Sequence, residues 1–316
     1  MKYSKKVTGL LMITFSLFFV FGVVNAQENE DPFEVTDTWK EKIYELAPSE
    51  TTVKVDKRRK LLLFSLHTGF KHWVIPHTDV IMQTLAEKTG AFEIVTTKDP
   101  AMFERKNLRQ FDAVILNNNC SVGEHRNLFY DTFKDDNDLT EEEKFEKAQQ
   151  LEDNLLRFVK KGGGLITLHG GIVMQNNSME FSKMLGGSFD YHPVQQELNV
   201  KLVDAEHPMV QAFDGKGFTH VDEPYMFKNA YRDFNFRPLL YIETDMIKKK
   251  RKEDTDKVKY ISWIKPYGKG HVFYSSPSHN AQSFDNPDLL QYFLDGMQYA
   301  CGDLECDDSP VGGPPQ

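Results

Sequence analysis

A glycine-bounded apolar segment near the middle of the chain constrains the fold most. Residues 162–171 read Gly-Gly-Gly-Leu-Ile-Thr-Leu-His-Gly-Gly, and the apolar residues of 151–161 are spaced as on one face of a helix. Lys160 and Lys161, followed by glycine, are typical of a helix end. A short apolar run without alternation is typical of a strand buried on both faces, as in parallel sheets. The strand ends at His169. This side chain is either a functional group, at the edge where open α/β sheets bind ligands, or a hydrogen-bonded cap of the strand.

Similar strands precede this segment. Residues 60–67 and 112–117 are largely apolar and residues 92–97 alternate weakly, so each predicts a strand. A helix is predicted over residues 76–88, opened by proline and closed by glycine. Strands that alternate with helices indicate right-handed crossovers. We therefore predict an α/β fold with a flavodoxin-like, doubly wound, mostly parallel sheet and helices on both faces.

Three of these strands are expected to end in a polar side chain, namely His67, Asn117 and His169. Because the carboxyl ends of parallel strands meet at one edge of the sheet, these side chains should lie close together there. This convergence indicates a site more strongly than any one of the three residues does.

The second half of the chain has a different pattern. Predicted strands at 197–203, 239–243, 260–264 and 271–275 follow one another without long helices, and the last two are joined as a hairpin. They predict an added antiparallel region, followed by a last helix over residues 287–301. The acidic stretch 130–147 is expected to be a solvated loop that leads into the long helix before the glycines.

The start of the chain has the features of a secretory signal peptide. Residues 1–26 have a basic beginning, an apolar run over 7–24 and a small residue, Ala26, suited to cleavage. An uncleaved membrane anchor is the alternative. We expect an exported protein, periplasmic or secreted, with no stable membrane span after cleavage.

The remaining chain divides by composition. Residues 27–58 are polar and predict a linker with one short helix, and residues 59–302 predict a single α/β domain. Residues 303–316 are acidic and then rich in glycine and proline, which predicts a disordered tail.

Charge and cysteine content exclude several classes of protein. The net charge of −9 argues against a nucleic-acid binder, and three cysteines are too few for a disulfide scaffold. Cys301 and Cys306 could pair in an oxidising compartment, which leaves Cys120 unpaired and buried. The turn after the central strand carries neither serine nor cysteine, which disfavours nucleophilic catalysis. Glycines 162–164 precede the strand, so they do not form a phosphate-binding loop.

The residues that could carry chemistry are mostly histidines in loops. The chain has ten histidines, and imidazoles with a carboxylate suit acid–base catalysis near neutral pH. The same groups could bind a divalent metal, so a metal stays possible while no cofactor is certain. A structural hydrogen-bonding role is the alternative for each histidine, and we assign His207 to it. The catalytic candidates are His72, His169, Glu223 and His279, and the substrate-binding candidates are His67, Asn117, His192, Asp222 and Tyr225.

An ordered set of short segments resembles the trehalose-utilisation (ThuA-like) family, which is related to the class I glutamine amidotransferase fold. No segment is specific alone, but together they span about residues 60–300. They are Gly69–His72, Gly162–His169, Leu185–Gly187 with His192 and Pro193, His207 with Pro208, Asp222–Tyr225, Tyr267–Tyr274 and His279. The chain departs from the family pattern at Pro224, usually an aromatic residue, and at Ser278, usually a glycine.

The resemblance implies a flavodoxin-like sheet without the amidotransferase cysteine, and a link to sugar catabolism. It implies a small-molecule carbohydrate as ligand, notably 3-keto-glycosides formed by a sugar oxidoreductase partner. We therefore expect an enzyme that acts on keto-sugars by hydrolysis, elimination or isomerisation. Glu223 or His169 would be the base, His72 or His279 the acid, and Tyr225 a hydrogen-bond donor to an enolate oxygen. The alternative is a non-catalytic sugar-binding module of the cell envelope.

Overall fold

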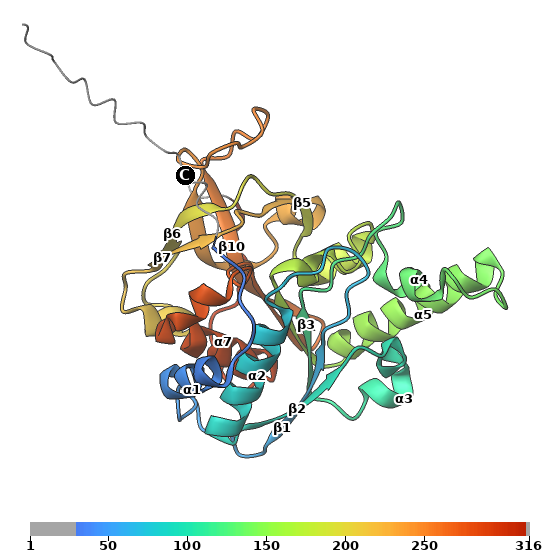
Figure 1. The fold of residues 1–316 in the computed structure, drawn as a ribbon, viewed down its shortest axis with the longest axis horizontal. Helices are drawn as coiled ribbons and strands as arrows, with labels where there is room; N and C mark the ends of the chain where they lie inside the picture. Colours follow the sequence, from blue (N-terminus) through green and yellow to red (C-terminus); the bar gives the residue numbers. More distant parts are fainter. Residues whose placement is uncertain (1–29, 314–316) are drawn as a thin grey trace, which may run out of the picture.

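Five parallel strands form the centre of the fold (Figure 1). The computed structural model describes residues 30–313. The first four strands along the chain lie in the order second, first, third, fourth, and β11 completes the parallel part. This order is that of flavodoxin-like folds, so the predicted fold class is confirmed. The parallel strands, from the edge inward, are β2 (Phe92–Thr97), β1 (Arg59–Phe64), β3 (Ala113–Asn117), β4 (Gly164–Leu168) and β11 (Gly270–Ser275).

The predicted antiparallel region extends the same sheet beyond β11. The predicted hairpin is formed, and its turn begins at Gly268 with a φ of 66°. A side chain there would bring its Cβ to 2.5 Å from the carbonyl oxygen of Lys160, so glycine is required. The added strands are β10 (Val258–Tyr267), β9 (Arg237–Glu243), β6 (Gln196–Leu202) and β7 (Phe218–Asp222), with a separate pair β5 (Ser188–Tyr191) and β8 (Met226–Lys228).

Helices cover both faces of the parallel strands (Figure 1). On one face lie α1 (Asp37–Leu46), α2 (Ile75–Thr89) and α7 (Pro287–Ala300). On the other lie α4 (Leu128–Phe133), α5 (Glu141–Lys160) and α6 (Met179–Leu185), with α3 (Arg105–Leu108) against α5. Short 3₁₀ turns connect these elements: η1 (Pro100–Phe103), η2 (His169–Val173), η3 (Pro208–Phe213), η4 (Asn229–Asp233) and η5 (Ala281–Asp285).

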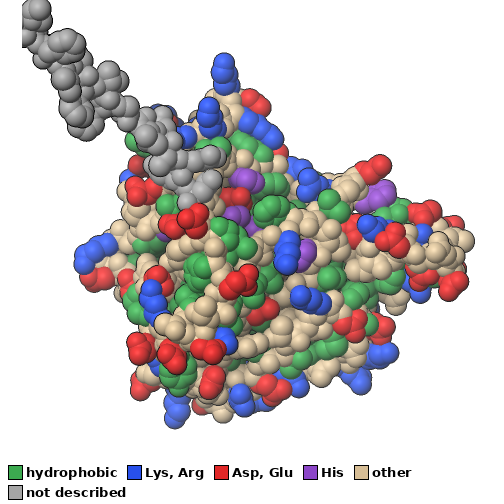
Figure 2. Space-filling view, viewed as in Figure 1, with side chains coloured by type: hydrophobic (Ala, Val, Ile, Leu, Met, Phe, Trp, Pro, Cys, Tyr) green, Lys and Arg blue, Asp and Glu red, His purple; other side chains and the backbone are tan. Residues whose placement is uncertain are grey.

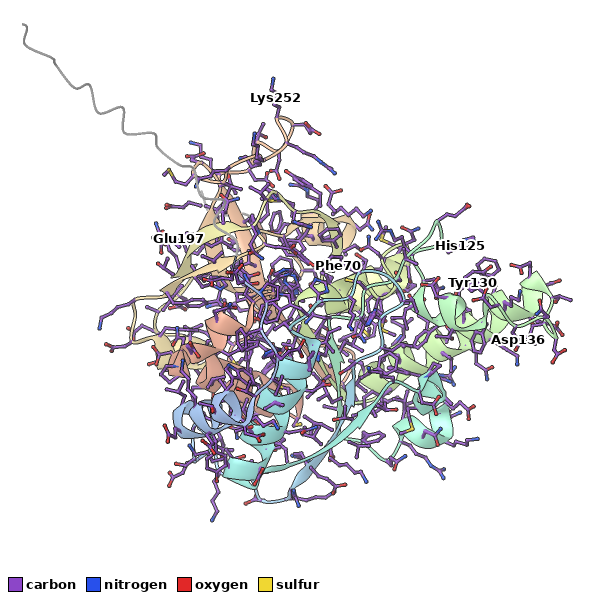
Figure 3. The ribbon with its side chains drawn as sticks, in the orientation of Figure 1. Phe70, His125, Tyr130, Asp136, Glu197 and Lys252 are labelled. Atoms are coloured by element: carbon purple, nitrogen blue, oxygen red, sulfur yellow. The ribbon has the colours of Figure 1, made fainter. Side chains whose placement is uncertain are left out.

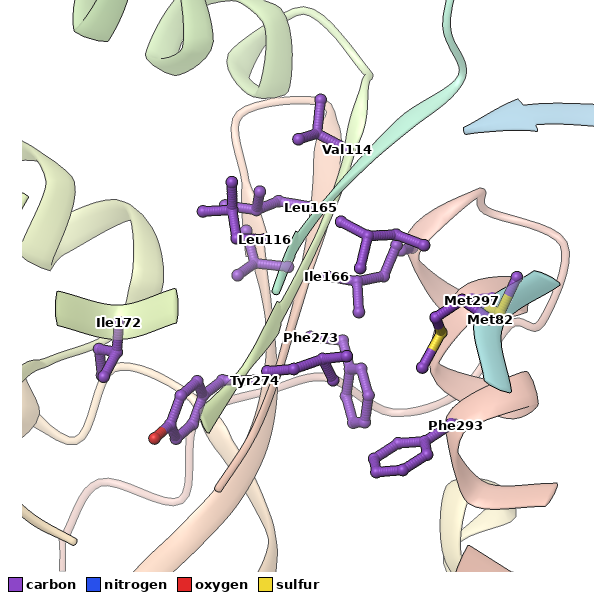
Figure 4. Close-up of a cluster of buried hydrophobic side chains, with 14 of the residues drawn as sticks. Met82, Val114, Leu116, Leu165, Ile166, Ile172, Phe273, Tyr274, Phe293 and Met297 are labelled. Atoms are coloured by element: carbon purple, nitrogen blue, oxygen red, sulfur yellow. The ribbon is translucent and has the colours of Figure 1, made fainter. Parts of the chain in front are cut away.

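The core lies on both sides of β4 (Figure 4). Leu165 packs toward Leu116 on one face, whereas the next residue, Ile166, faces Met82 and Met297 on the other. All of these side chains are almost completely buried. Burying a side chain of this size stabilises the fold by about 1.5–3 kcal/mol, which explains the continuous apolar run.

The acidic stretch predicted as a loop is largely helical. Residues 134–140 alone lie between α4 and α5, and α5 begins at Glu141. Thr140 and Glu143 form a capping box, and Glu141 and Glu142 lie in the first turn. Negative charges stabilise a helix at its N-terminus, so the acidic composition favours helix rather than loop here.

The chain on either side of the domain core also has structure. The predicted short helix is α1, and Thr52 beyond it donates a hydrogen bond to Asp295 on α7. Composition predicts disorder from residue 303 onward, yet Asp303 pairs with Arg59, and Tyr299 donates to Asp308 at 2.9 Å. Arg59 lies far from the tail in the sequence and Tyr299 is buried, so the composition of the tail reveals neither contact.

Two expectations concern cysteines and the membrane. Cys301 and Cys306 are free thiols in the structure rather than a disulfide. Within residues 30–313, no helix has both the length and the apolar composition that crossing a membrane requires. The predicted signal peptide, residues 1–26, lies outside the described residues.

Candidate functional site

Four predicted catalytic residues meet at the carboxyl edge of the sheet. His72 follows β1, His169 follows β4, Glu223 follows β7 and His279 follows β11. One nitrogen or oxygen atom from each lies within 4.8 Å of the others. The three histidines are buried, and the Glu223 side chain is 12% exposed. The sheet order thus brings together groups from four distant segments, and we call these four residues the His/Glu cluster.

Three atoms of the His/Glu cluster form a tight triangle. Glu223 Oε2 lies 3.3 Å from His169 Nε2 and 3.2 Å from His279 Nδ1. The two nitrogens are themselves 3.2 Å apart. The His72 ring lies edge-on to both other imidazoles, with ring centroids 5.1 Å away in each case. His72 therefore adjoins the triangle without belonging to it.

His169 is held by its backbone as well as by its ring. Its Nδ1 lies 2.8 Å from the carbonyl oxygen of Ser276, and its φ of 43° is in the left-handed region. Such a conformation is uncommon for residues other than glycine and is often found at functional sites. At Gly170, a Cβ would lie 2.8 Å from Cys120 Sγ and 2.9 Å from His72 Cε1. Glycine at this position therefore allows His72 to approach the end of β4.

Burial and mutual contacts shift the proton affinities of these groups. Burial lowers the pKa of His72, and the neighbouring His169 and His279 lower it further. Burial alone would raise the pKa of Glu223, but the adjacent imidazoles of His169 and His279 outweigh burial and hold that pKa well below its usual range. Burial opposes the charge on His279, yet the adjacent Glu223 carboxylate raises the His279 pKa. Burial raises the pKa of Cys120 to about 12, so this thiol is protonated near neutral pH and is a poor nucleophile.

Asp222 lies behind the His/Glu cluster. It is 1% exposed, and its Oδ1 accepts a hydrogen bond from the Glu223 backbone N–H at 2.7 Å. Its Oδ2 accepts from the His279 backbone N–H at 3.4 Å and lies 3.5 Å from His220 Nδ1. Asp222 therefore contacts the backbone of two cluster residues, and its substrate-binding role stays a prediction.

Two other predicted substrate residues do adjoin the cluster. The Tyr225 ring packs on His169 with centroids 4.1 Å apart, and burial raises the Tyr225 pKa well above its ordinary value. The His192 side chain is 38% exposed, and its Nδ1 lies 3.7 Å from Glu223 Oε1. His192 therefore lies on the solvent side of Glu223.

Asn117 and His67 do not join the cluster as predicted. Asn117 donates to the carbonyl oxygen of Ile75 and to Asp79 at 3.0 and 2.9 Å, so it braces β3 against α2. His67 lies three residues beyond the end of β1 and is partly exposed, and among the described contacts none links it to the cluster. The strand ends do share one edge, but the last few residues turn these side chains elsewhere.

Asn118, the residue after Asn117, contacts the end of β4 in place of Asn117. Its Oδ1 accepts a hydrogen bond from the backbone N–H of Gly170 at 3.2 Å, and its φ is 53°. Cys120 lies 3.8 Å from His72 Nδ1. Asn118 and Cys120 directly follow β3, and this place in the sequence is the signal that could have identified them as site residues. His207, assigned to a structural role, caps η3 by accepting from the Met209 N–H.

The surface over the site is aromatic and rich in histidine. Phe70 is 63% exposed, and its ring lies edge-on to His72 at 4.7 Å. Figure 3 shows Phe70 near the middle of this face, and Figure 2 shows histidine side chains reaching the surface in the same central region. Two cavities, of about 1140 and 770 Å³, lie elsewhere, against α5 and at the amino ends of β3 and β4. The chemistry-bearing groups therefore form a compact cluster and line neither of these two cavities.

This arrangement can perform two kinds of chemistry. Imidazoles beside a carboxylate transfer protons near neutral pH. Two imidazole nitrogens and a carboxylate oxygen are also a common ligand set for divalent transition metals.

Comparison with known proteins agrees with the fold. A ThuA-like protein from Bacteroides uniformis is 15% identical, with a TM-score of 0.56 over 86% of this chain and 95% of its own. A ThuA-like protein from Parabacteroides merdae is 16% identical, with a TM-score of 0.56 over 82% of this chain and 95% of its own. At these identities the likeness shows a shared fold. None of the curated proteins matches the chain.

The family comparison covers most of the domain. The ThuA family, described as trehalose utilisation, matches residues 60–300, which contain every cluster residue. Because the match extends over more than half of the sequence, this chain belongs to the ThuA family.

Proposed function

We propose that this protein is an enzyme of carbohydrate metabolism that acts on keto-sugars or 3-keto-glycosides at the His/Glu cluster. The observation that carries the proposal is the convergence of three imidazoles and a carboxylate within 4.8 Å at the ligand-binding edge of the sheet. A module that only binds sugar needs amides and aromatic faces, not buried titratable groups. The family description, trehalose utilisation, supports a sugar as substrate.

The chemistry of a 3-keto-glycoside fits these groups. The ketone acidifies the C–H bond at C2, and loss of that proton gives an enolate. The enolate electrons form the C1–C2 double bond while the bond from C1 to the glycosidic oxygen breaks, and the leaving oxygen takes up a proton. One proton-transfer group near C2 and one group that stabilises the enolate oxygen are sufficient.

The contacts support giving these two tasks to different groups. His169 Nε2 and His279 Nδ1 both contact Glu223 Oε2, whereas the His72 ring stands beside the triangle. We assign proton transfer at C2 and at the leaving oxygen to His72, in preference to the other candidate bases. The triangle, with the Tyr225 hydroxyl, faces the ketone oxygen in this assignment.

The surroundings suit a sugar ring. Phe70 presents an exposed aromatic face next to His72, and aromatic faces pack against the apolar faces of sugars. His192 lies beside Glu223 on the solvent side and is available to bond a sugar hydroxyl. These contacts would place the substrate over His72.

Export belongs to the same proposal. The basic and apolar residues 1–26 support secretion or a periplasmic location, where a sugar oxidoreductase would supply the 3-keto-glycoside. Measuring the mass of the protein recovered from each cell fraction tests both cleavage and location. Cleavage after Ala26 and recovery outside the cytoplasm are expected, and an intact N-terminus on cytoplasmic protein would contradict export.

The decisive experiment is NMR of the purified protein with a panel of 3-keto-glycosides. Wild type should form product, and His72→Gln, which retains a polar side chain of similar length, should slow turnover about 10²-fold or more. His125→Ala, at an exposed histidine, is the matched control. Saturable sugar binding without product at any pH would overturn the enzyme assignment and support the sugar-binding module.

A further inference from the structure

We propose that the His/Glu cluster binds one divalent transition-metal ion, held by His169 Nε2, His279 Nδ1 and Glu223 Oε2, with His72 beside the remaining coordination position. The inference concerns ion binding, so it can be tested without any sugar substrate.

The triangle has the dimensions of a metal site. Its three edges are 3.2, 3.2 and 3.3 Å. Ligands about 2.0–2.1 Å from a tetrahedral zinc ion are separated from one another by about 3.3 Å. An ion therefore fits at coordination distance from all three atoms without rearrangement of the side chains.

The hydrogen bond from His169 to Ser276 leaves two acceptor atoms facing each other in the triangle. A carbonyl oxygen only accepts, so the bond to Ser276 places the His169 proton on Nδ1 and leaves the Nε2 lone pair pointing at Glu223. An imidazole lone pair and a carboxylate oxygen then face each other at 3.3 Å, and both are acceptors. A cation between them converts this repulsion into two bonds.

The surroundings of the ligands also resemble those of metal sites. A metal-binding histidine commonly donates its second ring N–H to a backbone carbonyl, as His169 does to Ser276. Asp222 fixes the backbone at both of the other ligands, Glu223 and His279. The ligands are thus oriented by two groups that do not themselves reach the ion.

The donor types select the class of ion. Imidazole nitrogens favour zinc, iron, cobalt, nickel or copper over magnesium and calcium, which prefer oxygen ligands. Three protein ligands leave a position for water or a substrate oxygen, as in catalytic rather than structural sites. On the proposed function, which this last step assumes, that position would receive the ketone or enolate oxygen.

The test is metal content and zinc titration of the full mature chain, made without a polyhistidine tag. Wild type and His125→Ala should each hold about one equivalent of Zn²⁺ after dialysis against metal-free buffer. His169→Asn, His279→Gln and Glu223→Gln should each bind Zn²⁺ at least about tenfold more weakly. Asparagine is chosen at residue 169 because it tolerates the left-handed backbone there.

Circular dichroism of each variant separates ion loss from unfolding, and Co²⁺ absorption of the wild-type chain reports ligand geometry. An intense visible Co²⁺ spectrum that is lost in folded Glu223→Gln supports the site. Absence of stoichiometric Zn²⁺ and Co²⁺ in wild type, or wild-type affinity in all three folded variants, would overturn it. Failure of the sugar assay with normal metal binding would instead count against the proposed function alone.

Discussion

The Nδ1 atom of His169 lies 2.8 Å from the carbonyl oxygen of Ser276, a residue 107 positions away in the sequence. The two residues follow β4 and β11, which are parallel neighbours in the sheet. The bond determines which nitrogen of His169 carries the proton, and therefore which nitrogen faces Glu223 and His279. The pairing of β4 with β11 thus determines which nitrogen of His169 faces the other cluster residues.

Replacing His169 should abolish turnover without unfolding the protein. In His169→Asn the left-handed backbone is tolerated, but the nitrogen that faces Glu223 is lost. We expect turnover of a 3-keto-glycoside to fall at least about 10²-fold. Initial rates by NMR, with circular dichroism to check the fold, measure this. Near wild-type turnover would remove His169 from the mechanism.

Asp222→Asn should weaken zinc binding by disturbing the backbone at Glu223 or His279. An amide cannot accept hydrogen bonds at both of its ends, so either the Glu223 or the His279 backbone loses its partner. Loss of a group that orients metal ligands reduces affinity by about 10–100-fold. Zinc titration and a thermal melt, run together, distinguish the roles. A lower melting temperature with unchanged zinc affinity would make Asp222 a purely structural residue.

Tyr225→Phe should separate oxygen stabilisation from metal binding. Phenylalanine keeps the ring that packs on His169 at 4.1 Å but removes the hydroxyl. Removing one donor to a developing oxyanion lowers turnover about 10²-fold or more. Turnover should fall while the zinc content stays at the wild-type level. Unchanged turnover would exclude the hydroxyl as the donor to the enolate oxygen.

Gly170→Ala should destabilise the protein through overpacking. The new Cβ would lie 2.8 Å from Cys120 Sγ and 2.9 Å from His72 Cε1, so one of them must move. We expect a loss of about 1–3 kcal/mol in the free energy of unfolding, measured by urea titration. Adding Cys120→Ala to Gly170→Ala should recover part of the lost stability. The close contact with His72 remains, so turnover by the double variant should stay below the wild-type rate. Equal stability of Gly170→Ala and wild type would refute the packing argument.

Asp295 should make stability depend on pH. Its side chain is 2% exposed, and burial raises its pKa to about 6 despite hydrogen bonds from Thr52 and Gln291. A raised pKa of an acid means that the folded state binds the proton more tightly. The contribution of protonated Asp295 to the free energy of unfolding is therefore fully present below about pH 4 and is lost as the pH rises through about 6. The loss is on the order of 3 kcal/mol.

Asp295→Asn should therefore be more stable than wild type at pH 7.5, with a flatter stability profile between pH 4 and 7. Urea titrations at a series of pH values measure this, and Asp288→Asn, an exposed residue of the same helix, is the control. A profile that keeps its wild-type slope in Asp295→Asn would contradict the assignment.

The elements could be predicted because local patterns encode burial. The apolar run of β4, the proline that opens α7 and the glycine at the β10–β11 turn each specify their own element. The prediction of a loop at the start of α5 is wrong, because negative charge is compatible both with solvated loops and with helix N-termini. A capping box at Thr140 and Glu143 decides between them.

The sequence by itself therefore determined the class of fold, the family and the residue types available for catalysis. Only the tertiary structure decided which of those residues meet. Asn118 rather than Asn117 supports the turn after β4, and buried Asp222 accepts a hydrogen bond from the backbone of Glu223. The physical reason is that periodicity records how deeply a segment is buried. Contacts such as that between Glu223 and His279 depend instead on strand order and on single-residue backbone turns, which no local pattern contains.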